Sequence, residues 1–105
     1  MPDYRVRMME FLIRTGRDHG WPDLPSTELA RVLNPAGWDC STIPGSGEHR
    51  LRCGDAEVSF TGEDVGWHLV IDGQMEQATA QAFVATVAAQ IELEVAEPIK
   101  WLQIT

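Results

Sequence analysis

Residues 38–72, WDCSTIPGSGEHRLRCGDAEVSFTGEDVGWHLVID, decide the fold of this chain. Apolar and polar residues alternate along this stretch, and glycine-containing turns divide it into runs at 38–43, 48–53, 56–61 and 67–72. A period of two is that of a half-buried β-strand, and short glycine turns join neighbouring antiparallel strands. The stretch therefore predicts a four-stranded antiparallel meander.

The turn positions also predict which residues face each other across the sheet. Turns centred on Ser46-Gly47, Gly54-Asp55 and Glu63-Asp64 fix the cross-strand partners by symmetry. The predicted pairs are Cys40 with Cys53, Leu51 with Val58, Cys53 with Ala56, Val58 with Leu69, Phe60 with Trp67, and Ala56 with Ile71. A slip of one residue in any hairpin would put polar groups among the apolar ones, so the pattern supports this register.

This register divides the meander into an apolar face and a polar face. The apolar face collects Trp38, Cys40, Leu51, Cys53, Ala56, Val58, Phe60, Trp67, Leu69 and Ile71. The polar face collects Asp39, Ser41, Arg50, Arg52, Glu57, Ser59, His68 and Asp72, with Ile43 and Val70 as apolar exceptions. An antiparallel sheet with one packed and one solvated face is the arrangement that this division favours.

The segments that flank the meander predict helices and one further strand. Residues 3–17 carry a wide apolar arc at helical spacing, which predicts a helix buried on two sides. A short helix over 27–33 follows a glycine- and proline-containing break, and a long helix is expected over 76–95. Residues 99–104 have the composition of a last strand.

The fold class that follows is a single α+β domain over residues 1–105. We expect two layers, with helices packed on one face of an antiparallel sheet of four to five strands, in the order ααββββαβ. The last strand is expected either parallel to residues 67–72 or antiparallel beside 38–43.

The charge of the chain limits its partners. Sixteen acidic residues against eight basic ones give a net charge of −8, which repels phosphate, so nucleic acid and anionic membranes are not expected partners. Residues 1–17 hold four arginines and two acids, a balance of +2 that leaves −10 for the rest. No stretch has the pattern of a signal peptide or a membrane span, from which we expect a cytoplasmic protein.

The two cysteines and the nearby histidine raise the question of a metal site or a redox pair. His49 and Cys53 lie about 13 Å apart along an extended strand, so they are not expected to share a zinc ion with Cys40. Opposed cysteines can form a disulfide, but a reducing cytoplasm argues against one. We therefore expect Cys40 and Cys53 to be small buried hydrophobic residues, with a redox switch as the open alternative.

The polar sheet face is the first candidate binding surface. It carries Arg50, Arg52, Glu57 and His68, with Arg52 expected opposite Glu57 and Ser59 between Arg50 and His68. The face lacks the exposed aromatic residues on which single-stranded RNA stacks. It is expected to be either a solvated face with cross-strand ion pairs or a surface that docks a partner.

The long helix offers the second candidate surface. Opposite its large apolar residues runs a stripe of small ones, Ala78, Ala82, Ala85 and Ala89, extended by Leu93 and Ala96. Small residues let another helix approach closely, either residues 4–13 of the same chain or a second copy in a homodimer. Alanine is also the best helix former, so propensity alone is a further explanation.

These features favour a small acidic protein-binding module without catalytic activity, of the adaptor, chaperone-like or immunity-like class, although no motif identifies a family. The chain holds no recognisable catalytic set, cofactor motif or metal-ligand spacing. The alternative is a small-molecule-binding protein or an enzyme that uses Arg50, Arg52 and His68 on the open sheet face.

Overall fold

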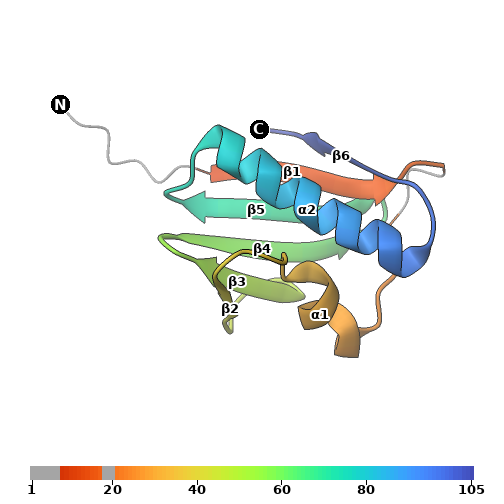
Figure 1. Cartoon of the computed structure of the whole chain (residues 1–105), viewed down its shortest axis with the longest axis horizontal. Helices are drawn as coiled ribbons and strands as arrows, with labels where there is room; N and C mark the ends of the chain where they lie inside the picture. Colours follow the sequence, from red (N-terminus) through yellow and green to blue (C-terminus); the bar gives the residue numbers. More distant parts are fainter. Residues whose placement is uncertain (1–7, 18–20) are drawn as a thin grey trace.

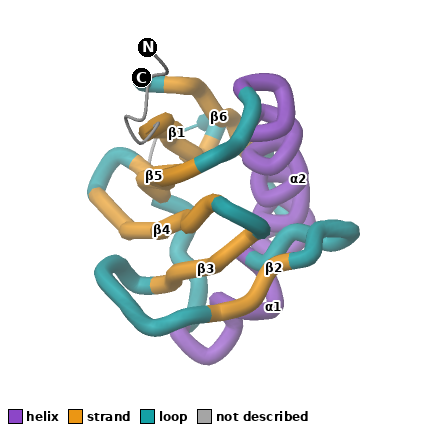
Figure 2. The backbone as a smooth tube through the Cα atoms, turned by 90° about the vertical axis from the view of Figure 1, so that its left-hand side faces the viewer, coloured by secondary structure: helices purple, strands orange, loops and turns teal. Residues whose placement is uncertain are grey.

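The structure, a computed structural model, describes residues 8–17 and 21–105. Its elements are β1 (Met8–Thr15), the 3₁₀ turn η1 (Ser26–Glu28), α1 (Leu29–Leu33), β2 (Cys40–Thr42), β3 (His49–Cys53), β4 (Ala56–Glu63), β5 (Gly66–Gly73), α2 (Gln77–Val95) and β6 (Ile99–Gln103). The strands form one antiparallel sheet in the order β2-β3-β4-β5-β1-β6. Both helices lie on the same side of this sheet, which makes a two-layer α+β domain (Figures 1 and 2).

The predicted meander is confirmed as strands β2 to β5. In the first two hairpins the predicted register is also confirmed: Cys40 pairs with Cys53, Leu51 with Val58, and Cys53 with Ala56. The predicted apolar face is the face that packs on the helices. Its residues from Leu51 to Ile71 are buried, whereas Trp38 and Cys40 at the start are only partly buried.

The predicted register of the third hairpin is wrong by two residues. Val58 pairs with Ile71, Phe60 with Leu69, and Ala56 with Gly73. The turn is centred on Asp64-Val65, because Glu63 and Gly66 are the last pair of the ladder. A shift of two residues keeps every side chain on its predicted face, which is why the alternation of apolar residues did not reveal it.

The helix predicted over residues 3–17 is wrong where the structure describes it. Residues 3–7 lie outside the described ranges, and 8–15 form strand β1 between β5 and β6. Phe11 and Ile13 point into the core, while Leu12, on the opposite side, is only 9% exposed. Leu12 is thus a buried apolar residue on the helix-free face, next in sequence to the buried residues of the packed face, and the combination resembles the wide apolar arc of a buried helix.

The last strand takes neither of its two predicted positions. β6 pairs antiparallel with β1, with Leu12 opposite Leu102 and Arg14 opposite Lys100. Both predictions placed it beside a strand of the meander, because residues 8–15 were counted as a helix. The sheet therefore has six strands instead of four or five, and β1 precedes the first helix in the element order.

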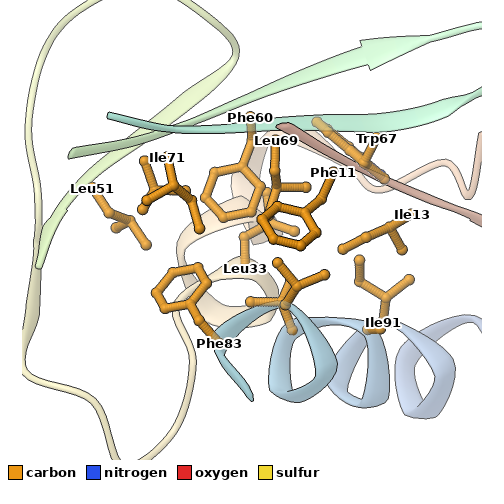
Figure 3. Packing of buried hydrophobic residues seen from close by; sticks show 14 of the residues in the cluster. Phe11, Ile13, Leu33, Leu51, Phe60, Trp67, Leu69, Ile71, Phe83 and Ile91 are labelled. Carbon is orange, nitrogen blue, oxygen red and sulfur yellow. The ribbon is translucent and has the colours of Figure 1, made fainter. Parts of the chain in front are cut away.

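The two remaining helix predictions are confirmed. The short helix is formed by η1 and α1 and ends at Leu33, and the long helix α2 begins at Gln77 and ends at Val95. Figure 3 shows how Phe83 and Ile91 of α2 and Leu33 of α1 meet the inward side chains of the sheet. The fully buried large residues are Trp67, Phe11, Phe60, Phe83, Ile13, Leu33, Leu51, Leu69, Ile71 and Ile91.

Candidate interaction surfaces

The arginine pair of the polar face is held by Glu57. Arg50 donates from Nε and Nη2 to Glu57 Oε1 at 3.1 and 2.7 Å, and Arg52 donates from Nη2 to Glu57 Oε2. The hydrogen bond from Arg50, with the positive charges of both arginines, holds the pKa of Glu57 below its usual value. Both guanidinium groups therefore already have an anionic partner within the sheet.

His68 lies apart from these arginines. Because the third hairpin is shifted by two residues, Ser59 pairs with Val70, and His68 pairs with Thr61 and Leu12. Its Nε2 is 3.0 Å from Glu10 Oε1, and its Nδ1 is 3.5 Å from Glu63 Oε2. The predicted grouping of Arg50, Ser59 and His68 in one row is therefore wrong, and His68 belongs to a separate acidic group.

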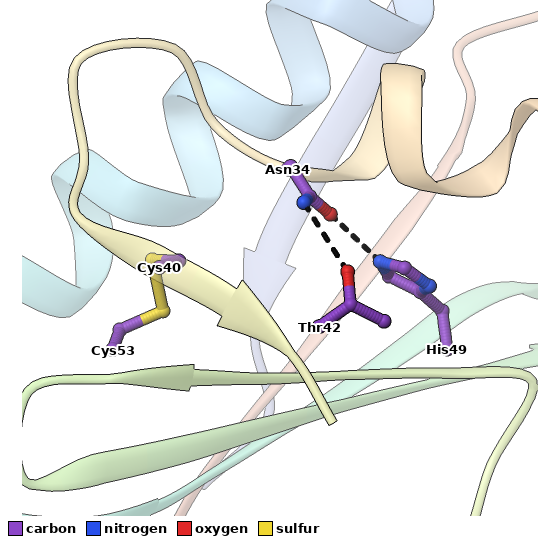
Figure 4. The surroundings of a disulfide bond; sticks show 5 residues. All are labelled: Asn34, Cys40, Thr42, His49 and Cys53. Carbon is purple, nitrogen blue, oxygen red and sulfur yellow. Dashed lines mark hydrogen bonds between the residues drawn. A yellow bond between two sulfur atoms is a disulfide. The ribbon is translucent and has the colours of Figure 1, made fainter. Parts of the chain in front are cut away.

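The two cysteines form a disulfide between β2 and β3 (Figure 4). Their opposition was predicted correctly, but the expectation that they remain free, buried thiols is wrong. The expectation rested on the assumed compartment, whereas the geometry of an antiparallel pair brings the two side chains within bonding reach. Because both sulfurs are used in this bond, neither is a thiolate that binds metal.

A buried polar group at the other end of β3 from the disulfide was not predicted (Figure 4). His49 is 8% exposed, and its Nε2 lies 2.7 Å from Asn34 Oδ1. The Asn34 amide donates to Thr42 Oγ1, so its Oδ1 accepts and His49 carries the proton on Nε2. Burial lowers the pKa of His49. The sequence does contain a signal for this burial: His49 lies two residues before Leu51 and four before Cys53, so it shares their face of the strand.

The alanine stripe of α2 faces away from the sheet. Ala78, Ala82, Ala85 and Ala89 are all exposed, and Leu93 is 85% exposed. The proposed internal partner, a helix that includes residues 4–13, does not exist over 8–13, where the chain is β1. In the described part of the chain the stripe is left without a covering element.

Helix α1 contacts α2 along a different flank. The Gln90 side-chain amide donates to the carbonyl oxygens of Val32 and Asn34 at 2.8 and 3.0 Å. Nearby, Arg31 forms an ion pair with Glu94 at 2.8 Å. These contacts fix the short helix beside the long one and leave the alanine stripe open.

A third surface lies where β6 forms one edge of the sheet. Met8, Leu102 and Ile104 are 57, 39 and 49% exposed. The side chains of Leu102 and Ile104 point to the helix-free side of the sheet, because Trp101 and Gln103, which alternate with them, face α2. The sequence did not reveal this apolar group, because the apolar pattern of residues 8–15 predicted a helix there.

No protein-family model, curated protein or solved structure matches this chain. Within the described residues, none of the helices has the length and apolar character needed to cross a membrane.

Proposed function

We propose that this chain is a protein-binding module that acts without catalysis and binds through the β6 edge and the helix-free sheet face beside it. The observation that carries the proposal is the coincidence of exposed apolar side chains, Met8, Leu102 and Ile104, with an edge strand of the sheet. Edge strands offer backbone hydrogen bonds to an added strand, and apolar side chains beside them add buried area. A protein partner satisfies both.

The other two surfaces give weaker support to the same function. Arg50 and Arg52 already bind Glu57, so a partner would have to replace those hydrogen bonds and not simply add to them. The alanine stripe offers little apolar area per residue, and Leu93 is its only large side chain. We keep both as secondary contact surfaces.

The alternative of an enzyme or small-molecule binder around Arg50, Arg52 and His68 has less support. The shifted hairpin places His68 beside Glu10 and Glu63, away from the arginines. A site that depends on all three side chains converging on one ligand therefore lacks its geometry.

The disulfide bears on where the protein acts. Disulfides persist in oxidising compartments and are rare where glutathione and thioredoxin keep thiols reduced. The Cys40–Cys53 bond therefore supports an oxidising compartment over the cytoplasm that the sequence led us to expect.

Site-specific photo-crosslinking in the source cell tests the proposed function. A photoreactive residue in place of Leu102 should form protein adducts, because that position lies at the centre of the proposed surface. Ser41 is the matched control, since it is also exposed and lies on the opposite edge strand. Equal labelling at both positions, or no adduct at Leu102, would contradict the proposal.

A further inference from the structure

The backbone of β6 alternates between a bonded and an open side. Gly16 N–H donates to Pro98 O at 2.8 Å, and Ile104 N–H donates to Glu10 O at 2.7 Å. In an antiparallel ladder hydrogen-bonded pairs recur at every second residue, so Lys100 and Leu102 also turn their N–H and C=O groups toward β1. The N–H and C=O groups of Trp101 and Gln103 consequently point away from the sheet.

The two ends of β6 are closed to further pairing. The N–H of Ile99 donates to Glu92 Oε2 at 3.0 Å, so it is already used. At the other end, Ile104 N–H and Thr105 N–H both donate to Glu10 O, and Glu10 N–H donates to Thr105 O. This is the pattern of a β-bulge, which turns the Thr105 backbone toward β1. In the described part of the chain, the open N–H groups of this edge are therefore those of Trp101 and Gln103.

This short open edge is complementary to itself. If two β6 strands meet antiparallel with Leu102 at the two-fold axis, Trp101 of each copy lies opposite Gln103 of the other. The N–H and C=O groups of Trp101 and Gln103 in both copies are then all paired. A register centred on Trp101 would need the Ile99 N–H, and one centred on Gln103 would need the Thr105 backbone, and both are occupied.

The charges on the helix-free face fit the same arrangement. Arg14 and Lys100 lie directly opposite each other, which is unfavourable for like charges. Neither has an ion pair among the described residues, and the Nε of Arg14 is buried without a hydrogen-bond partner there. In the two-fold register Lys100 lies opposite Ile104 of the second copy. Glu10 of that copy is on the next strand, opposite its own Ile104, so it lies two strand spacings, about 10 Å, from Lys100.

We infer that a second copy of this chain docks along β6, antiparallel and centred on Leu102, and joins the two sheets into one. This inference rests on the proposed function, because it names the partner of the same edge. Leu102 of the two copies pack together on the helix-free face, and Ile104 covers the stem of the facing Lys100. Each Arg14 and Lys100 pair is brought toward a Glu10 carboxylate, which offsets its like charge.

Cysteine crosslinking tests the register. Both native cysteines are bonded to each other, so Leu102→Cys introduces a lone thiol into the described part of the chain. Mild oxidation should convert Leu102→Cys into a covalent dimer, because directly opposed residues lie within disulfide reach. Lys100→Cys alone should crosslink poorly, but a mixture of Lys100→Cys and Ile104→Cys should form a heterodimer.

A backbone substitution tests the edge hydrogen bonds. Gln103→Pro removes an outward N–H and leaves the bonds to β1, whereas Gln103→Ala keeps that N–H and removes the same side chain. Sedimentation equilibrium should show a dimer for the wild type. Gln103→Pro should weaken it at least about tenfold relative to Gln103→Ala, because two symmetric hydrogen bonds are lost. Thermal unfolding confirms that both variants are folded.

The outcomes separate this inference from the proposed function. A monomeric wild type, or a dimer that crosslinks through Ala85→Cys on the alanine stripe and not through Leu102→Cys, overturns the β6 dimer. If the wild type is monomeric but the photoreactive residue at 102 captures a different protein, the inference fails and the proposed function stands. If neither a dimer nor an adduct forms, both fail.

Discussion

At the scale of single residues, burial decides the chemistry more than residue type does. His49 on β3 and His68 on β5 are separated in the sheet only by β4, yet His49 is buried against an amide and His68 lies between two carboxylates. The alternation of residues along a strand predicts which face each histidine occupies. Its polar neighbours depend on which strands pair and on the position of Asn34 at the end of α1. Those contacts are long-range, and a single sequence does not contain them.

The buried His49 predicts a dependence of stability on pH. Its pKa is lowered in the folded state by burial, so the unfolded chain binds its proton at a higher pH. The free energy of unfolding should therefore fall as the pH drops below about 6.5, down to the lowered folded pKa. Denaturant unfolding across this range measures the slope, and His49→Gln should reduce it. An unchanged slope in His49→Gln would show that another group is responsible.

The close packing of Gly66 against β1 predicts that even a methyl side chain at this position lowers the stability of the protein. Its φ is +140°, and an added Cβ would collide with the carbonyl oxygen of Ile13 on β1. Gly66→Ala should lower the free energy of unfolding by more than about 2 kcal/mol. Gly54→Ala is the matched control, because its φ is also positive but nothing lies within 4 Å of the added atom. Equal losses in both variants would argue against β1 lying beside β5.

At the scale of elements, the sequence predicts strands and helices well where one face is buried. The meander and α2 each have one packed side, so their periods of 2 and 3.6 are clear. In β1 the buried Leu12 on the helix-free face obscures the period of two. The helix predicted there misplaced β6 and left the open edge unrecognised. The third hairpin failed differently, because a slip of two residues leaves the pattern of faces intact.

The disulfide predicts a loss of stability on reduction. It closes a loop with a sequence separation of 13 and ties the three-residue strand β2 to β3. Removing it should reduce the free energy of unfolding by about 3 kcal/mol, mainly because the unfolded chain gains conformational entropy without the cross-link. Denaturant unfolding of the native protein and of a Cys40→Ala/Cys53→Ala variant measures the difference.

A thiol titration provides the control for that prediction. When the protein is unfolded without a reductant, a thiol reagent should detect no free thiol, because both sulfurs are bonded. Two reactive thiols in that experiment would show that the bond is not formed in the isolated protein.

At the scale of the whole molecule, both described helices cover the same face of the sheet, and its other face carries no helix of the described residues. The net charge of −8 is unfavourable for contact with phosphate. Leu102 and Ile104 place exposed apolar side chains beside the β6 edge. The overall class was predictable because it depends on the meander and α2. The binding edge was not, because it depends on where the first and last strands meet.

Amide hydrogen exchange, measured by NMR over a dilution series, tests most directly whether this edge binds a second copy. Lys100 and Leu102 donate to β1, so their amides should exchange slowly at every protein concentration. The amides of Trp101 and Gln103 should exchange rapidly in dilute protein and slow as concentration rises, because the second copy pairs them. Rapid exchange of both amides at all concentrations would contradict the account.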